Sequence, residues 1–225
     1  MTPTEPRERL PALGLDEIVS VALDLARELG LDGLTMRTVA GHFGTTPMAL
    51  YHHVRDKQTL VDLVVDAVLA QVRVPDQGSW EQRLRTLSLA VADALDRYPG
   101  VAARLADTPG LPPNGRRLME ASLSFLLDAG FDETEAGLAY ATVHTFMYGR
   151  FNVEAAMRGR RAPRSRAPVA AGFPALDLVG PAQVNLHGRD FREYGLDTVI
   201  SGLRNRLAET RARAAGVTPA SPSPS

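Results

Sequence analysis

The chain has 225 residues, enough for one large domain or two smaller ones, and 44% of them are apolar, which suffices for a sizeable core. It contains no cysteine, which excludes a disulfide framework, a thiolate metal site and a cysteine nucleophile. No uncharged apolar run is long enough to span a membrane, and the N-terminus lacks the apolar stretch of a signal peptide. These absences lead us to expect a cytoplasmic protein without a membrane partner.

The N-terminal part reads as an arm followed by a helix. Residues 1–13 hold three prolines and are predicted to form a flexible arm. A first helix is predicted from about Asp16 to Leu29, because Ile18, Ala22, Leu25, Ala26 and Leu29 recur at helical spacing. Gly30 is expected to end it, since glycine adopts the left-handed backbone at low cost.

Residues 34–57 (LTMRTVAGHFGTTPMALYHHVRDK) read as two short helices and the start of a third. Thr35 suits the N-cap of the first helix, and Gly44 the turn that ends it. Thr46 can cap the second, with Pro47 at its first position, where a missing N–H costs nothing. A helix, a glycine-containing turn and a short helix are typical of a helix-turn-helix, whose second helix enters a DNA major groove.

The second short helix exposes a surface that a core does not require: Pro47, Met48, Tyr51, His52, His53 and Lys57. Tyr51 and Lys57 can reach phosphates, while Pro47 and Met48 can touch thymine methyl groups. Leu50 and Val54 are expected in the core.

A further helix over about 57–72 is predicted to begin after Asp56 and to connect this head to the rest of the chain. Residues 14–73 thus form the predicted DNA-binding domain. Its charge argues against that function, since residues 1–72 hold six basic and ten acidic groups. Residues 34–58, however, carry three basic groups against Asp56 alone. We therefore expect weak non-specific binding with a modest salt dependence.

These features resemble the TetR family of bacterial transcriptional regulators. The resemblance is carried by residues 22–30, LTMRTVA, Gly44, ALYHHV and the helix start at Asp56–Lys57. Residues 191–207 (FREYGLDTVISGLRNRL) are similar to the last helix of tetracycline-repressor-like members. The resemblance implies an all-α fold, with an N-terminal three-helix DNA-binding domain and a larger helical domain for ligand binding and dimerisation.

The resemblance also implies DNA contacts by Thr35, Arg37, Thr46, Pro47, Met48, Tyr51, His52, His53 and Lys57. Arg37 would meet a guanine edge or a phosphate, and Thr35 a phosphate. His52 and His53 are alternatively surface residues without a contact. Pro47 stands where the tetracycline repressors have glutamine, and proline cannot make a bidentate contact to adenine, so their operator sequence does not transfer. The arm is either disordered or touches the minor groove or backbone.

Residues 79–213 are predicted to form the second domain, without strand-like alternation. Helices are expected over about 79–98, where Ser79 and Gln82 make a capping box, and over 101–106, 115–129, 132–157 and 190–213. Residues 158–189 mix arginines with prolines and are predicted to be a flexible loop rather than a second nucleic-acid site. Residues 214–225 are predicted to be a disordered tail.

By resemblance, the second domain is a small-molecule receptor whose apolar pocket is lined by Met119, Ser122, Phe125, Tyr140, His144, Met147 and Phe151. His144 either orients a ligand, or chelates a metal-bound one, or is a satisfied core histidine. Phe125 and Met147 are alternatively core residues. No cofactor and no metal site is predicted.

The last helix carries an apolar stripe that is either ordinary core or a dimer seam. The resemblance favours a four-helix bundle made by two helices of each chain. We therefore predict a dimer interface formed by Val143, Phe146, Leu196, Ile200, Leu203 and Leu207.

The sequence as a whole predicts a homodimeric repressor that binds a palindromic operator in double-stranded DNA and is released by a small-molecule inducer. One alternative is an activator or a regulator without a ligand. Another is an enzyme with an appended helix-turn-helix. The enzyme is disfavoured because the chain has no Gly-rich phosphate loop, HExxH or GxSxG motif.

Overall fold

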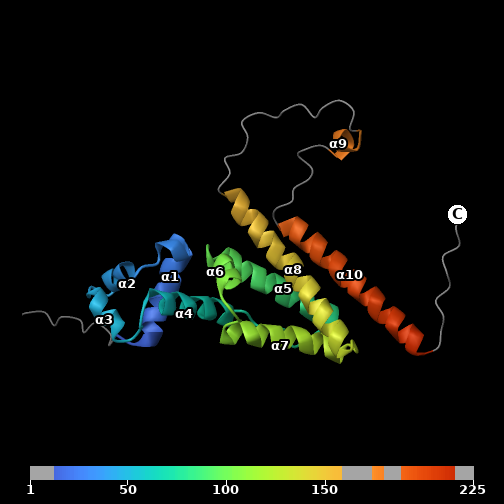
Figure 1. Ribbon diagram of the computed structural model, residues 1–225, viewed down its shortest axis with the longest axis horizontal. Coiled ribbons are helices and arrows are strands. Elements are labelled where there is room, and N and C mark those ends of the chain that lie inside the picture. Colours follow the sequence, from blue (N-terminus) through green and yellow to red (C-terminus); the bar gives the residue numbers. More distant parts are fainter. Residues whose placement is uncertain (1–12, 159–173, 180–188, 216–225) are drawn as a thin grey trace, which may run out of the picture. The chain divides into compact units, whose positions relative to one another are not determined.

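A computed structural model describes residues 13–158, 174–179 and 189–215, without the side chains of 150–158, 176, 177 and 179 (Figure 1). Throughout these residues the regular elements are helices, which confirms the all-α prediction. The helices are α1 (Leu15–Gly33), α2 (Met36–His42), α3 (Pro47–Tyr51), α4 (Lys57–Ala70), α5 (Trp80–Asp96), α6 (Val101–Asp107), α7 (Pro113–Asp128), α8 (Glu133–Arg158), α9 (Pro174–Val179) and α10 (Arg189–Ala214). No helix among the described residues is long and apolar enough to cross a membrane.

Contacts divide the chain into two compact units. The first runs to Arg73 and also takes in Ala90–Leu118, while the second takes Val74–Leu89 and the chain from Met119 onward. The helices α5 and α7 therefore each contribute residues to both units. This grouping differs from the sequence-based division, which assigned the whole of 79–213 to the second domain.

In the first unit, α1 is interrupted rather than ended at Gly30. Gly30 has φ 70°, as expected for the glycine that stops a helix, but the helical turns resume to Gly33. Ile18, Ala22 and Ala26 are buried, as predicted, whereas Leu29 is 51% exposed. The interruption lets the amide of Leu31 donate to the carbonyl of Pro99, with N and O 2.9 Å apart.

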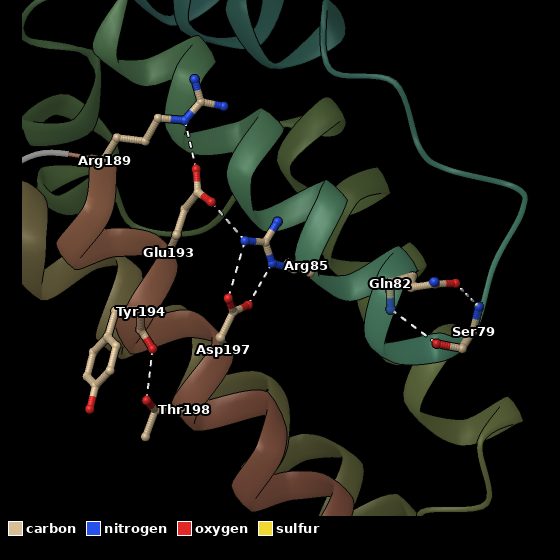
Figure 2. A network of polar contacts seen from close by, with 8 residues as sticks. All are labelled: Ser79, Gln82, Arg85, Arg189, Glu193, Tyr194, Asp197 and Thr198. Atoms are coloured by element: carbon tan, nitrogen blue, oxygen red, sulfur yellow. Dashed lines mark hydrogen bonds and ion pairs between the residues drawn. The ribbon is translucent and has the colours of Figure 1, made fainter.

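In the second unit, α10 packs against α8 and is joined by ion pairs to α5. Figure 2 shows Arg85 of α5 between two carboxylates of α10, at 2.9 Å from Glu193 and 2.6 Å from Asp197. The predicted capping box at the start of α5 is confirmed, because Ser79 N–H donates to Gln82 Oε1 at 2.9 Å and Gln82 N–H donates to Ser79 Oγ at 3.4 Å (Figure 2). These ion pairs are partly exposed, so they add little to the stability of the second unit.

The apolar stripe of α10 is part of the core of the second unit. Leu196, Ile200, Leu203 and Leu207 are buried within the single chain. On α8, Val143 is buried as well, and the ring of Phe146 lies so close to Gly195 that a Cβ there would collide with it. Of the two alternatives for this stripe, ordinary core is therefore the one that the structure shows. The assignment of these six residues to a dimer seam stays a prediction, and Phe146 is the one among them that is only half-buried in the single chain.

Within the predicted loop 158–189, the described residues Pro174–Val179 form a short helix, α9, that the arginine and proline pattern did not predict. Its first residue is Pro174, and proline suits the first helical position because the missing N–H has no partner there in any case. The remainder of that loop, most of the predicted arm and nearly all of the predicted tail lie outside the described residues.

Candidate DNA interface and receptor domain

The start of α2 is held by a reciprocal cap between two threonines. The amide of Thr38 donates to Thr35 Oγ1 at 3.0 Å, and the amide of Thr35 donates to Thr38 Oγ1 at 2.9 Å. The predicted N-cap role of Thr35 is thus confirmed. Arg37 follows in the first turn of α2, and its side chain is exposed.

The turn between α2 and α3 depends on Gly44, which has φ 61°. No atom lies within 4 Å of the position that a Cβ would take there, so the backbone conformation alone favours glycine. Thr46 precedes α3 and Pro47 is its first residue, as predicted. Thr46 makes no side-chain hydrogen bond to the helix, so the predicted side-chain cap is wrong. The fixed φ of Pro47 starts the helix without that bond.

The orientation of α3 is set by two buried side chains. Leu50 is fully buried, and so is Val54 just beyond the helix, which confirms that both are core residues. The opposite face of this five-residue helix is open: Met48 is 68% and Tyr51 46% exposed. His52, His53 and Lys57 are exposed as well. We call Arg37, Met48, Tyr51, His52, His53 and Lys57 the head surface.

The N-terminus of α4 is capped by Asp56. Its carboxylate accepts the Thr59 amide at 2.7 Å and the Thr59 hydroxyl at 2.8 Å. A further hydrogen bond comes from the exposed guanidinium of Arg55, at 3.1 Å. The hydrogen bonds from Thr59 and then from Arg55 lower the pKa of the Asp56 carboxyl, because they favour its ionised form.

The acidic residues of α4 that weighed against DNA binding are engaged within the first unit. Asp62 pairs with Arg104 of α6 at 2.6 Å, and Asp66 accepts the backbone amide of Asn114 in α7 at 2.7 Å. A count over residues 1–72 leaves Arg104 out, since it lies later in the chain. The first unit as a whole therefore carries a smaller excess of negative charge than residues 1–72 alone.

Two further side chains, Arg117 and Tyr98, hold the C-terminal end of α4, and neither was predicted from the sequence. Arg117 donates to the carbonyls of Leu69 and Val72, at 3.1 and 3.0 Å. The hydroxyl of the buried Tyr98 accepts Gln71 at 3.0 Å and also Arg27 of α1, at 3.0 Å. Helix α4 is therefore bound to residues 90–118 along its length. No local signal in the sequence indicates these contacts, because their partners lie 27 to 71 positions apart in the chain.

In the second unit, the predicted pocket residues lie on different faces. Phe125 and Met147 are buried, Ser122 is a buried polar residue, and Met119 is half-buried. The guanidinium of Arg83 lies 4.4 Å from the centre of the Phe125 ring. The side chain of Phe151 is not among those that the structure describes. Phe125 and Met147 are thus core residues of the second unit, whether or not a ligand reaches them.

His144 does not lie on the buried face of α8. It is exposed and stacked between Tyr140 and Tyr148, with ring centres 5.5 and 4.8 Å apart. The two rings keep water from the imidazole and so lower its pKa, although the residue as a whole is exposed on the single chain. The alternative of a satisfied core histidine is therefore wrong. Among the described residues, no group of three His, Asp or Glu side chains is placed to hold a metal ion.

Two family models match this chain, one over the helix-turn-helix region and one over most of the remaining residues. The family described as "Bacterial regulatory proteins, tetR family" matches residues 18–64, and "Tetracyclin repressor-like, C-terminal domain" matches residues 74–207. The class E tetracycline repressor of Escherichia coli is 30% identical over 204 residues, which cover 88% of this chain and 94% of the repressor. The class A repressor from transposon 1721 of the same species is 31% identical over 207 residues, covering 86% and 92%.

Solved structures agree with these relatives. Apo ActR from Streptomyces coelicolor has a TM-score of 0.70 at 29% identity, covering 88% of this chain and 98% of ActR. ActR in complex with actinorhodin has a TM-score of 0.69 at 29% identity, covering 86% and 96%. The chain belongs to the TetR family of bacterial regulatory proteins and carries a tetracycline-repressor-like C-terminal domain.

Proposed function

We propose that this protein is a homodimeric transcriptional repressor that binds a palindromic DNA operator through the head surface and leaves it when a small molecule binds. The observation that carries the proposal is the open face of α3, where Met48 and Tyr51 are exposed above the fully buried Leu50. The second helix of a helix-turn-helix is held by its buried face and presents its exposed face to the major groove, and α3 has both faces.

Each residue of the predicted DNA interface has a role in this proposal. Arg37 contacts a guanine edge or a phosphate, and Tyr51, His53 and Lys57 hold the DNA backbone. Thr46, Pro47 and Met48 lead α3 into the groove, with His52 on its exposed side. Thr35 contributes to phosphate binding through the backbone amides of α2, because its hydroxyl is used in the cap.

The receptor function rests on the second domain and on its relatives. The names of the tetracycline repressors, and ActR solved with actinorhodin, indicate small-molecule ligands of those proteins. In this chain, Met119, Ser122, Phe125 and Met147 combine apolar surface with one buried hydroxyl, the composition of a small-molecule site. We place the inducer against these residues, whereas the roles of Tyr140 and His144, which lie away from the buried face of α8, and of Phe151 stay predictions.

Coupling between inducer and operator would run through residues 90–118. Helices α5 and α7 continue from the second unit into the first, where Arg104, Asn114 and Arg117 bind α4. An inducer that shifts these residues would carry α4 with them and change the spacing of two recognition helices in a dimer. A hundredfold release requires about 2.7 kcal/mol of preference for the released state.

A footprint on the DNA upstream of the protein's own gene tests the proposal. We expect protection of a palindrome, with half-site centres about 34–36 Å apart or a little more. A panel of tetracyclines and other polycyclic compounds is then added, and one of them should abolish protection. A chain that protects no upstream DNA at low ionic strength would overturn the proposal.

We further place the protein in the cytoplasm and assign it no catalytic activity.

A further inference from the structure

The first turn of α3 carries no side chain that forms strong hydrogen bonds. It consists of Pro47, Met48 and Ala49, of which Met48 is 68% exposed. A methionine that is this exposed in a folded domain gains nothing from burial, although its side chain is apolar and polarisable. Its exposure therefore suits a partner that offers an apolar contact at the same place.

Met48 cannot be taken into the core by turning the helix. Leu50 is fully buried two positions further along, and Pro47 fixes the backbone at the helix start. Tyr51, three positions after Met48, lies on the same open face. The methionine side chain is thus held at the leading, exposed end of the helix that the proposed function places in the major groove.

A major groove presents one apolar group at its base edges, the C5-methyl of thymine. We infer that Met48 reads a thymine C5-methyl group, so that each operator half-site carries a thymine opposite the first turn of α3. This inference rests on the proposed function and adds the base chemistry that the protein selects. Base readout by hydrogen bonds then falls chiefly to Arg37, on α2.

Salt dependence separates this role from a phosphate contact. Met48 carries no charge, so Met48→Ala lowers operator affinity and leaves the slope of log affinity against log salt unchanged. Lys57→Ala, by contrast, removes a cation and should reduce that slope by about 1 per head. The two variants form a matched pair within one surface.

The direct test changes the DNA. Operators are selected from random duplex DNA with the wild-type protein, and each thymine of the best sequence is replaced in turn by deoxyuridine. We expect about a fourfold loss of affinity at the thymine read by Met48, since one methyl group leaves the contact. The symmetric pair together should lose about fifteenfold, if both half-sites contribute equally. Replacement by 5-bromodeoxyuridine should retain the affinity, because bromine fills the volume of the methyl group.

Two protein variants complete the experiment. Met48→Ala should bind the thymine and the deoxyuridine operators equally. Leu29→Ala removes an exposed apolar side chain of α1 outside the head surface, and should keep the wild-type preference for thymine.

If no deoxyuridine replacement weakens binding, the inference falls while the proposed function stands. If Met48→Ala keeps the preference, the methyl group is read by another residue and the inference also falls. Failure to enrich any sequence would overturn both.

Discussion

Leu50 and Tyr51 are neighbours in α3 and have opposite environments, since Leu50 is fully buried and Tyr51 is almost half exposed. Burial makes Leu50 responsible for the position of α3, whereas exposure makes Tyr51 available to a partner. A mutation in a small DNA-binding domain can weaken DNA binding either by unfolding the domain or by removing a contact. Mutations at Leu50 and Tyr51 distinguish these two effects.

Leu50→Ala should lower the free energy of unfolding by about 2–5 kcal/mol, because it leaves a cavity beneath α3. Tyr51→Ala should change it by no more than about 0.5 kcal/mol and still weaken operator binding. Urea unfolding and a gel-shift titration measure the two quantities. Equal stability losses for both variants would contradict the assignment of Leu50 as anchor and Tyr51 as contact.

Gly44 and Gly41 are a second informative pair, because a Cβ would meet no atom within 4 Å at either position. Gly44 has φ 61°, so Gly44→Ala should cost about 1–2 kcal/mol through backbone strain. Gly41 lies inside α2, and Gly41→Ala should stabilise by about 0.5–1 kcal/mol. Thermal unfolding of both variants tests this, and a stabilising Gly44→Ala would show that the turn does not need a left-handed residue.

At the scale of elements, α4 is the most constrained helix of the first unit. Asp56 caps its N-terminus, Arg104 pairs with Asp62, and Arg117 binds the carbonyls at its C-terminal end. Helix α4 also buries an apolar face, made of Leu60, Val61, Val64, Val65, Val68 and Leu69. It therefore has to shift together with the residues packed against it when the protein leaves DNA, as the proposed release requires.

The cap of α4 should make stability depend on pH. The hydrogen bonds from Thr59 lower the folded-state pKa of Asp56, so its contribution is complete above the usual aspartate pKa of about 3.9. That contribution is lost as the pH falls through the lower, folded-state value. Asp56→Asn still offers an acceptor for the cap but does not titrate. Its melting temperature should therefore fall less steeply than that of the wild type below about pH 4. Parallel curves for the two proteins would contradict this role.

For the whole molecule, the question is which surface meets a second copy. The stripe of α10 is covered within the chain, but Leu138 of α8 is 60% and Tyr194 of α10 75% exposed. These side chains lie on the two helices that the resemblance pairs in a four-helix bundle. We therefore move the proposed interface from the buried stripe to the exposed faces of the same helices.

Leu138→Glu should convert the proposed dimer to a monomer, since it places a charge in the apolar contact expected there. Leu127→Glu, at an exposed leucine of α7, is the matched control and should stay dimeric. Sedimentation velocity with both variants distinguishes the cases. A wild-type chain that sediments as a monomer at micromolar concentration would remove the basis of the palindromic operator.

Local signals in the sequence were sufficient for every described helix except α9 and for most of the head surface. The caps at Thr35, Asp56 and Ser79, the left-handed Gly44 and the buried Leu50 each depend on residues within a few positions of one another. Such short-range interactions recur wherever the same residues recur, so they can be read without the fold.

Tertiary structure decided what depends on residues far apart in the chain. Residues 90–118 join the first unit because Tyr98, Arg104 and Arg117 meet α1 and α4. The apolar residues of α10 would have the same helical spacing whether they packed against their own chain or against a partner. The sequence alone therefore did not distinguish these two cases. In the same way, periodicity placed His144 on an apolar helix, but only the packing of α8 shows which side of that helix is covered.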